Sequence, residues 1–178
     1  MKILLHTCCA PCLIYPYAQM SKKGVKASGF FYNPNIYPNQ EYQFRRQALI
    51  ALSGKQNIDI IYAEYNPREY FTAIQNKESS PERCAICWSI RLKRTALAAK
   101  ENGFDMFTTT LLVSPYQDQD TIKEIGNKIA REEKIGFYYE DFRPGFKTAY
   151  AQAKQDGLYC QQYCGCMYSN EAWIYRTK

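Results

Sequence analysis

The sequence lacks several features that common classes of protein require. It contains one histidine, and no hydrophobic run approaches the roughly 20 residues of a membrane-spanning helix, so we expect no membrane partner. Only residues 3–5 are continuously apolar before His6, which is too short for a signal-peptide core and favours a cytoplasmic protein. No glycine-rich phosphate loop follows a predicted strand, so ATP or dinucleotide binding is unsupported. One histidine also leaves little room for a hydrolytic triad.

Cysteine, in contrast, is abundant, with eight residues in a chain of 178. Cytosolic thiols are kept reduced, so four structural disulfides are not expected, and metal or redox chemistry is the leading explanation. Because there is a single imidazole, a site with several ligands must consist mostly of sulfur. The cysteines form three groups, Cys8-Cys9-x2-Cys12, Cys84-x2-Cys87 and Cys160-x3-Cys164-x-Cys166.

Apolar runs alternate with helical patterns along the chain, which predicts a βαβ organisation and a parallel sheet. Strands are expected at residues 2–6, 25–32, 58–62, 104–112 and 135–139, and helices at 11–23, 40–53, 68–75, 85–102, 121–133 and 146–155. We expect a single α/β domain over residues 1–178, Rossmann-like, with helices on both faces of the sheet and a cysteine-rich C-terminal segment.

The first and fourth predicted strands each end in residues that carry chemistry. Cys8, Cys9 and Cys12 follow the first strand, and residues 108–118 follow the fourth. Right-handed crossovers make these two loops neighbours if the two strands are adjacent, which is the usual switch point of such a sheet. The sequence therefore predicts a pocket beside the cysteines.

The cysteine spacing predicts a metal site of four sulfur ligands. Pro11 favours a helix start after Cys9, and a helix start favours thiolate over thiol. Cys84-x2-Cys87 alone could be a redox pair, but combined with a second thiol group it indicates zinc or a [4Fe–4S] cluster. The adjacent Cys8 and Cys9 are awkward as two ligands of one zinc ion, which favours the cluster. A zinc-stabilised RNA-binding module stays open as an alternative.

Cys164 and Cys166 are separated by one glycine, and such a pair can close only a tight ring. Strained disulfides are easier to reduce, and glycine supplies the backbone freedom that the ring needs. We interpret the pair as a reversible, redox-active dithiol, with metal ligation as the competing interpretation.

Positive charge accompanies the thiols. Residues 1–40 contain four lysines and no acid, and residues 83–100 contain five basic residues and no acid. Such a potential suits nucleic acid, although a solvated basic face without a partner is equally compatible. Arg91 and Arg94 are candidate substrate ligands.

Three further residues are candidates near the predicted pocket. His6 is either a structural hydrogen-bonding group or a proton donor. Asp118 either caps a helix or lines the pocket and supplies protons. Tyr116 could stack on a nucleobase.

Taken together, these motifs resemble those of the cobalamin-independent epoxyqueuosine reductases, the QueH family. The resemblance rests on His6-Thr-Cys-Cys-Ala-Pro-Cys12, Arg83-Cys-Ala-Ile-Cys87, Arg91-Leu92, Thr109-Thr-Leu-Leu-Val-Ser-Pro115 and Tyr163-Cys-Gly-Cys166. It implies a nucleotide α-hydrolase-like fold and the reduction of epoxyqueuosine to queuosine at the tRNA wobble position, the last step of queuosine biosynthesis. An external electron donor is implied as well.

The resemblance also implies roles for individual cysteines. Cys8, Cys9, Cys84 and Cys87 would bind a [4Fe–4S] cluster, and Cys164 with Cys166 would be the redox-active disulfide pair. The family is expected to hold an additional iron, and the corresponding ligand position here is Cys12. The alternative enzyme, an iron–sulfur tRNA sulfur-transfer enzyme, normally needs ATP, and the missing phosphate loop argues against it.

Overall fold

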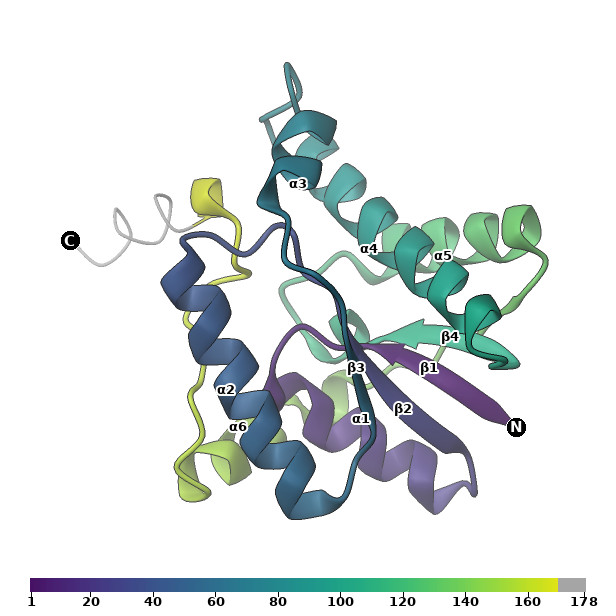
Figure 1. Cartoon of the computed structure of the whole chain (residues 1–178), viewed down its shortest axis with the longest axis vertical. Helices are drawn as coiled ribbons and strands as arrows, with labels where there is room; N and C mark the ends of the chain where they lie inside the picture. Colours follow the sequence, from purple (N-terminus) through teal and green to yellow (C-terminus); the bar gives the residue numbers. More distant parts are fainter. Residues whose placement is uncertain (170–178) are drawn as a thin grey trace.

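The protein is built around a five-stranded parallel sheet, seen in a computed structural model that describes residues 1–169 (Figure 1). The strands are β1 (Lys2–His6), β2 (Lys26–Phe31), β3 (Ile60–Tyr62), β4 (Met106–Thr109) and β5 (Gly136–Phe137). Their order is β3-β2-β1-β4-β5. The sheet therefore confirms the predicted parallel α/β class and the adjacency of the first and fourth strands. The end of the predicted domain, residues 170–178, lies outside the described residues.

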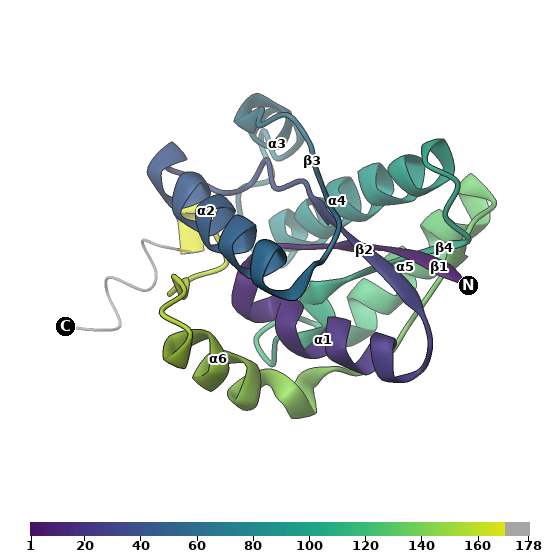
Figure 2. The same ribbon diagram turned by 60° about the horizontal axis from the view of Figure 1, so that its bottom comes forward.

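Helices cover both faces of this sheet, as predicted. They are α1 (Ala10–Lys22), α2 (Asn39–Gln56), α3 (Pro67–Ala73), α4 (Glu82–Glu101), α5 (Gln119–Glu133) and α6 (Phe146–Gln155), with 3₁₀ turns η1 (Thr110–Val113) and η2 (Arg143–Gly145). Helices α1, α2 and α6 lie on one face, and α4 with α5 on the other (Figures 1 and 2). Within the described part of the chain, no helix is both long and apolar enough to cross a membrane.

Strand β1 lies at the centre of the sheet because its sequence is apolar on both sides. Ile3, Leu4 and Leu5 are all fully buried, as expected for a strand covered by helices on both faces. At the carboxyl end of β1, His6 stands beside Phe30 of β2 and Thr109 of β4. The residues that follow His6 therefore lie at the middle of the carboxyl edge of the sheet, where ligands of open parallel sheets bind.

Some predicted boundaries are wrong, and the fourth strand is the clearest case. It was expected to reach residue 112 but ends at Thr109, because the Thr109 hydroxyl accepts a hydrogen bond from the Leu111 amide at 3.1 Å and starts η1. Helix α2 continues past Gly54 and ends at Gln56, and the next residue, Asn57, adopts a left-handed conformation. Helix α4 starts at Glu82 rather than at residue 85, so Cys84 lies in its first turn.

Candidate metal centre and dithiol

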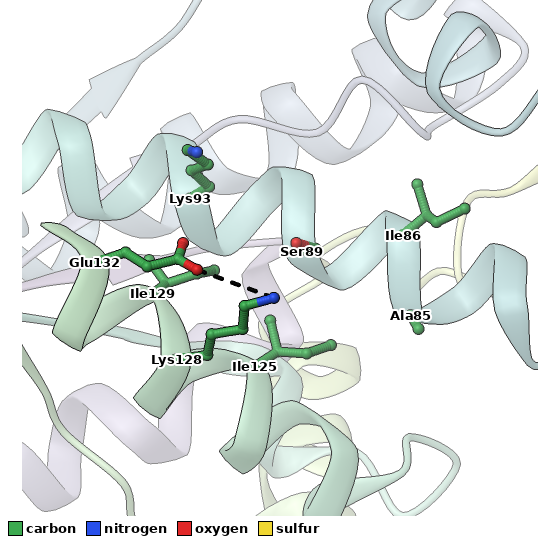
Figure 3. Close-up of a pocket in the computed structure, with 8 residues that line it drawn as sticks. All are labelled: Ala85, Ile86, Ser89, Lys93, Ile125, Lys128, Ile129 and Glu132. Carbon is green, nitrogen blue, oxygen red and sulfur yellow. Dashed lines mark ion pairs between the residues drawn. The ribbon is translucent and has the colours of Figure 1, made fainter.

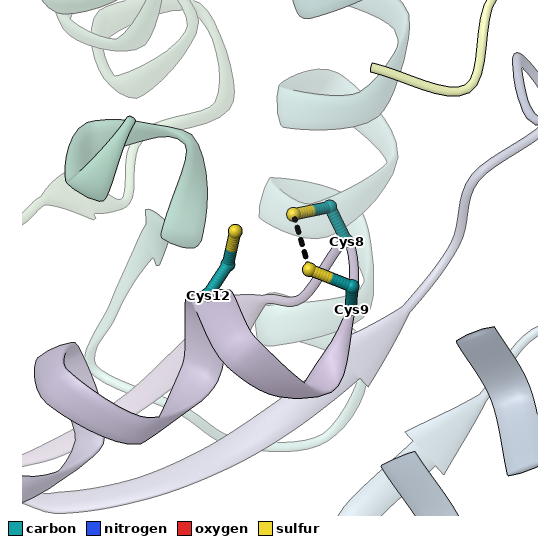
Figure 4. A group of neighbouring side chains, drawn as sticks. All are labelled: Cys8, Cys9 and Cys12. Atoms are coloured by element: carbon teal, nitrogen blue, oxygen red, sulfur yellow. Dashed lines mark hydrogen bonds between the residues drawn. The ribbon is translucent and has the colours of Figure 1, made fainter. Parts of the chain in front are cut away.

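Three thiols meet directly after β1, and we call Cys8, Cys9 and Cys12 the thiol triad (Figure 4). Their Sγ atoms all lie within 4.8 Å of one another, and all three residues are buried. The Cys8 and Cys9 sulfurs are 3.6 Å apart. Pro11 stands in the first turn of α1, as predicted, and Cys12 reaches back to the other two from that turn. The sequence analysis assigned Cys12 a different ligand role from Cys8 and Cys9, whereas in the structure the three sulfurs lie together.

The loop after β4 holds the thiol triad, which confirms that the two loops are neighbours. The Cys8 amide donates to the Thr110 hydroxyl at 3.2 Å, and this hydroxyl donates to the Cys8 sulfur at 3.4 Å. Thr110 therefore fixes both the backbone and the side chain of Cys8.

His6 is the last residue of β1, two residues before Cys8, and is completely buried. Its Nδ1 is 2.9 Å from the Thr109 hydroxyl, and its Nε2 is 3.1 Å from the Tyr32 carbonyl and 3.2 Å from the Asn33 side-chain oxygen. Burial, followed by the charge of Arg91, lowers the pKa of His6 to about 4. His6 is thus neutral at pH 7, with Nε2 as the donor, and it ties the ends of β1, β2 and β4 together. The predicted role as a proton donor stays a prediction.

The triad shares its protons unequally. Hydrogen bonds from Cys12 and Cys9 hold the pKa of Cys8 well below its usual value. Burial raises the pKa of Cys9, and the hydrogen bond to Cys8 raises that of Cys12. Cys8 is therefore the member of the triad that loses its proton most easily, and a metal ion that bound all three sulfurs would displace the protons that Cys9 and Cys12 retain.

The second thiol group belongs to α4, and we call Cys84 and Cys87 the α4 pair. Cys87 is buried in an apolar cluster with Tyr70, Ile74 and Cys166. Cys84 is half-buried, with its sulfur 3.6 Å from the Ser80 hydroxyl. Among the described residues, only the thiol triad forms a group of three close ligands, so the α4 pair lies outside that tight group.

Arg91 is close enough to Cys87, His6 and Cys164 for its charge to act on all three. It is buried on α4, and its Nε donates to the Cys87 carbonyl at 3.0 Å. Its charge contributes to the lowered pKa values of both His6 and Cys164. Arg94, one turn further along α4, is different, because it is only half-buried and pairs with Glu101 at 3.1 Å.

The third group is the C-terminal dithiol, Cys164 and Cys166, which are both free thiols. Cys164 is exposed and Cys166 is buried. A hydrogen bond from Cys166 lowers the pKa of Cys164 to about 5, while the pKa of Cys166 is raised. One member is therefore an accessible thiolate and the other a protonated thiol.

Sequence reasoning missed the residue that holds this dithiol, Arg45. Its side chain is 1% exposed, and its Nε pairs with Glu41 at 2.7 Å. Nη2 donates to the Tyr163 carbonyl at 2.9 Å, and Nη1 lies 3.4 Å from the Cys164 carbonyl. The Tyr37 amide donates to the Gly165 carbonyl at 2.8 Å. The carbonyls of three consecutive residues are thus bound by α2 and the loop before it.

An aromatic row leads from the surface to the thiol triad. Tyr116 is 82% exposed, and its ring meets Phe146 edge-on at 5.8 Å. Phe146 packs against Tyr150 at 4.6 Å, whose hydroxyl accepts from the Gln161 amide at 2.6 Å. The same amide lies 3.5 Å from the Cys12 sulfur. Tyr116 is therefore exposed and connected to the site, as its predicted stacking role requires.

Asp118 is the N-cap of α5, which confirms the first of its two predicted roles, capping a helix. It accepts from the Thr121 amide at 3.0 Å and from the Thr121 hydroxyl at 2.8 Å. These bonds hold the pKa of Asp118 below its usual value, so it is ionised at pH 7. Its participation in catalysis stays a prediction.

Two surface hollows have no cysteine in their linings, although Ala85 and Ile86, which line the first, lie between Cys84 and Cys87 in the sequence. One is a groove of about 430 Å³ between α4 and α5, which includes the Lys128–Glu132 ion pair (Figure 3). The other lies at the amino edge of the sheet, near Lys2 and Asp59. Neither contains a thiol, so the predicted pocket beside the cysteines stays a prediction.

Comparison with known proteins identifies the family. Residues 3–172 match the family model described as epoxyqueuosine reductase QueH. The chain belongs to the epoxyqueuosine reductase QueH family. It is 36% identical to the QueH of Dehalococcoides mccartyi, covering 94% of this chain and 92% of that protein. It is 35% identical to the QueH of Thermotoga maritima, covering 94% and 89%. The resemblance drawn from the motifs is confirmed.

Solved structures show the same fold in proteins with little sequence similarity to this QueH family member. A predicted subunit of a tRNA methyltransferase from Methanocaldococcus jannaschii superposes with a TM-score of 0.56 at 10% identity, covering 86% of this chain and 76% of that one. A deacetylase of teicoplanin biosynthesis gives 0.51 at 8% identity, covering 77% and 68%. At this level of identity the likeness concerns the fold alone.

Proposed function

We propose that this chain reduces epoxyqueuosine to queuosine at the wobble position of tRNA. The observation that carries the proposal is the presence, in a QueH family member, of a buried thiol triad directly after β1 together with a separate free dithiol. Removing the epoxide oxygen as water consumes two electrons and two protons. A dithiol that closes to a disulfide releases two electrons.

The residues present suit an iron–sulfur cluster. Cys8 and Cys9 with the α4 pair would supply the four thiolates of a [4Fe–4S] cluster, which transfers electrons when bound. Three observations support this donor set: the thiols are free, Cys8 already favours the thiolate, and Arg91 places positive charge beside Cys87. Cys12 is the candidate ligand of an additional iron.

The side chains of the chain itself have separate tasks in this proposal. His6 keeps the ends of three strands together, because both of its nitrogens are occupied. The C-terminal dithiol receives electrons from an external donor and delivers them inward. The dithiol supplies both electrons and the proton of Cys166, and water supplies the second proton, because Cys164 is already a thiolate. Neither the neutral His6 nor the ionised Asp118 is needed as an acid.

The substrate would bind through exposed aromatic and basic residues. Tyr116 offers an open ring face at the end of the aromatic row, and an unpaired wobble base could stack on it. Arg94 is half-buried on α4, with a partly exposed side chain that is suited to phosphate contacts, whereas the buried Arg91 is better placed to act on the thiols than on tRNA. We expect this reaction to take place in the cytoplasm.

The test is anaerobic incubation of the purified protein with reductant and epoxyqueuosine-containing tRNA, followed by mass spectrometry of the nucleosides. Conversion to queuosine is expected, and an unchanged epoxide would refute the function. A thiolated nucleoside would instead support the sulfur-transfer alternative. Iron, sulfide and zinc analysis of the same sample addresses the cofactor, because a colourless protein with stoichiometric zinc would support the zinc-stabilised module.

A further inference from the structure

The two thiols of the C-terminal dithiol lie in opposite environments. Cys164 is exposed, whereas Cys166 is 3% exposed and packs in the apolar cluster of α3 and α4. Within that cluster the Tyr70 hydroxyl lies 3.1 Å from the Cys166 sulfur, and Tyr70 itself is 1% exposed. The hydroxyl is therefore held against one specific sulfur of the pair, out of contact with solvent.

We propose that Tyr70 is a catalytic residue in the regeneration of the dithiol, where its hydroxyl donates a hydrogen bond to Cys166 as the sulfur that leaves. This inference rests on the redox role of the dithiol in the proposed function. It adds the direction of the exchange: an external thiol attacks Cys164, and Cys166 is expelled.

The reaction is a thiol–disulfide exchange in two steps. A thiolate of the external reductant attacks the Cys164 sulfur of the Cys164–Cys166 disulfide, forms a mixed disulfide with Cys164 and releases Cys166 as a thiolate. Tyr70 stabilises that thiolate until it takes up a proton. A second thiolate of the reductant attacks the outer sulfur of the mixed disulfide and releases Cys164. The reductant is oxidised to a disulfide, and the protein gains two electrons and the one proton that Cys166 takes up, because Cys164 remains a thiolate.

The surrounding backbone enforces this direction. Arg45, Tyr37 and Asn35 hold the carbonyls of residues 163–165, so the loop cannot turn to bring Cys166 outward. Attack on Cys166 would require a reductant to enter a cluster occupied by Tyr70 and Ile74. Cys164, in contrast, is an exposed residue.

The first experiment measures reduction of the disulfide in the Tyr70→Phe variant. The holoprotein is oxidised anaerobically with one equivalent of diamide, and its reduction by dithiothreitol is followed by mass spectrometry of the peptide that contains both cysteines. Loss of a hydrogen bond to a developing thiolate should slow reduction about tenfold or more. The midpoint potential should fall by up to about 30 mV, the equivalent of a tenfold change in the equilibrium constant.

The matched control is Tyr138→Phe, which removes the hydroxyl that donates to Glu140 at 2.5 Å, beyond β5. It should reduce at the rate of the unaltered protein. If Tyr70→Phe also reduced at that rate, the role of Tyr70 would be wrong while the dithiol role stood. If diamide produced no Cys164–Cys166 disulfide in the unaltered protein, the dithiol role itself would fail, and the inference with it.

The second experiment identifies the attacked sulfur without altering Tyr70. Cys166→Ser retains the exposed thiol and should form a mixed disulfide with 5,5′-dithiobis(2-nitrobenzoate) at Cys164 at least about tenfold faster than Cys164→Ser forms one at Cys166, because access governs the exchange. Equal rates, or faster reaction at Cys166, would overturn the proposed direction.

Discussion

The loop after β1 and the C-terminal segment, residues 158–166, both present cysteines, but they are held in different ways. The first loop is an extension of the central strand, and its backbone is fixed by neighbouring strands through His6 and Thr110. The C-terminal segment has no regular secondary structure and is held by side chains from α2 and the loop before it, above all by Arg45. The thiols of the first loop are all buried, whereas the second exposes Cys164.

This difference corresponds to two chemical requirements. A metal site benefits from ligands that are fixed before the metal arrives, and β1 provides such a frame at the centre of the fold. A dithiol that exchanges electrons with other molecules must keep one sulfur accessible. Side-chain anchors at the edge of the fold allow this exposure while keeping the backbone in place.

The largest effect should follow from breaking the first loop. Cys9→Ser removes a fixed, buried thiol, and we expect bound iron and reductase activity to fall at least about 100-fold, since even outer-shell changes cost 10–100-fold in metal affinity. Iron analysis and nucleoside mass spectrometry check this. Cys160→Ser is the control, because its half-buried thiol donates to the Leu158 carbonyl at 3.5 Å and is not among the proposed metal ligands. Comparable losses in both variants would contradict a site centred on the first loop.

The second-largest effect should follow from removing Arg45, which anchors the C-terminal segment. Arg45→Met leaves the buried Glu41 without its ion pair and frees the carbonyls of Tyr163 and Cys164, at an expected cost of about 3–5 kcal/mol in the free energy of unfolding. Urea denaturation measures it.

Arg46→Met is the matched control for this change. Arg46 lies 5.1 Å from the Tyr62 ring, a contact worth about 1 kcal/mol or less when partly exposed. Equal destabilisation by the two substitutions would show that Arg45 is not the special anchor.

A smaller change tests how tightly the same segment is seated. Gly165 has φ +103°, and an added Cβ would lie 2.8 Å from Ile36 Cγ1 and 3.4 Å from Arg45 Nη1. Gly165→Ala should therefore cost about 3 kcal/mol in thermal unfolding. Gly157→Ala, at φ +68° with open space around it, should cost only about 1 kcal/mol. Similar losses of stability in the two variants would mean that the backbone around Gly165 shifts easily to accommodate the added Cβ.

The smallest effect should come from Tyr116, which belongs to neither thiol region. Tyr116→Ala should raise the KM for tRNA roughly fivefold, the lower end of what a stacked base loses, about 1 kcal/mol, with no loss of stability. Tyr116→Phe preserves the ring and should behave like the unaltered protein. Equal KM values for all three proteins would exclude stacking on this residue.

The first loop was largely predictable from sequence, and the C-terminal segment was not. An apolar run followed by Cys8 and Cys9 predicted a strand ending in a thiol loop, and the crossover rule predicted its contact with the loop after β4. Both predictions use local sequence and general topology. The end of β4 escaped prediction because three consecutive threonines favour a strand, while the hydroxyl of Thr109 also caps a turn.

Arg45 and Tyr70 escaped prediction because their partners are far away in sequence. Arg45 lies in a polar helical stretch and looks solvent-exposed, yet it binds carbonyls 118 and 119 residues later. Tyr70 is one of sixteen tyrosines, and its contact with Cys166 spans 96 residues. Such contacts depend on how helices pack on the sheet, which periodicity does not specify.

The central position of β1 also has a consequence for biosynthesis. The thiol triad is made first, but Thr110, which fixes Cys8, follows about a hundred residues later, and the dithiol is made last. On the ribosome the three thiols therefore emerge unprotected and without their frame. A metal site that used this frame could form only once β4 and Thr110 have been made, so its assembly would mark chains whose central strands have already paired.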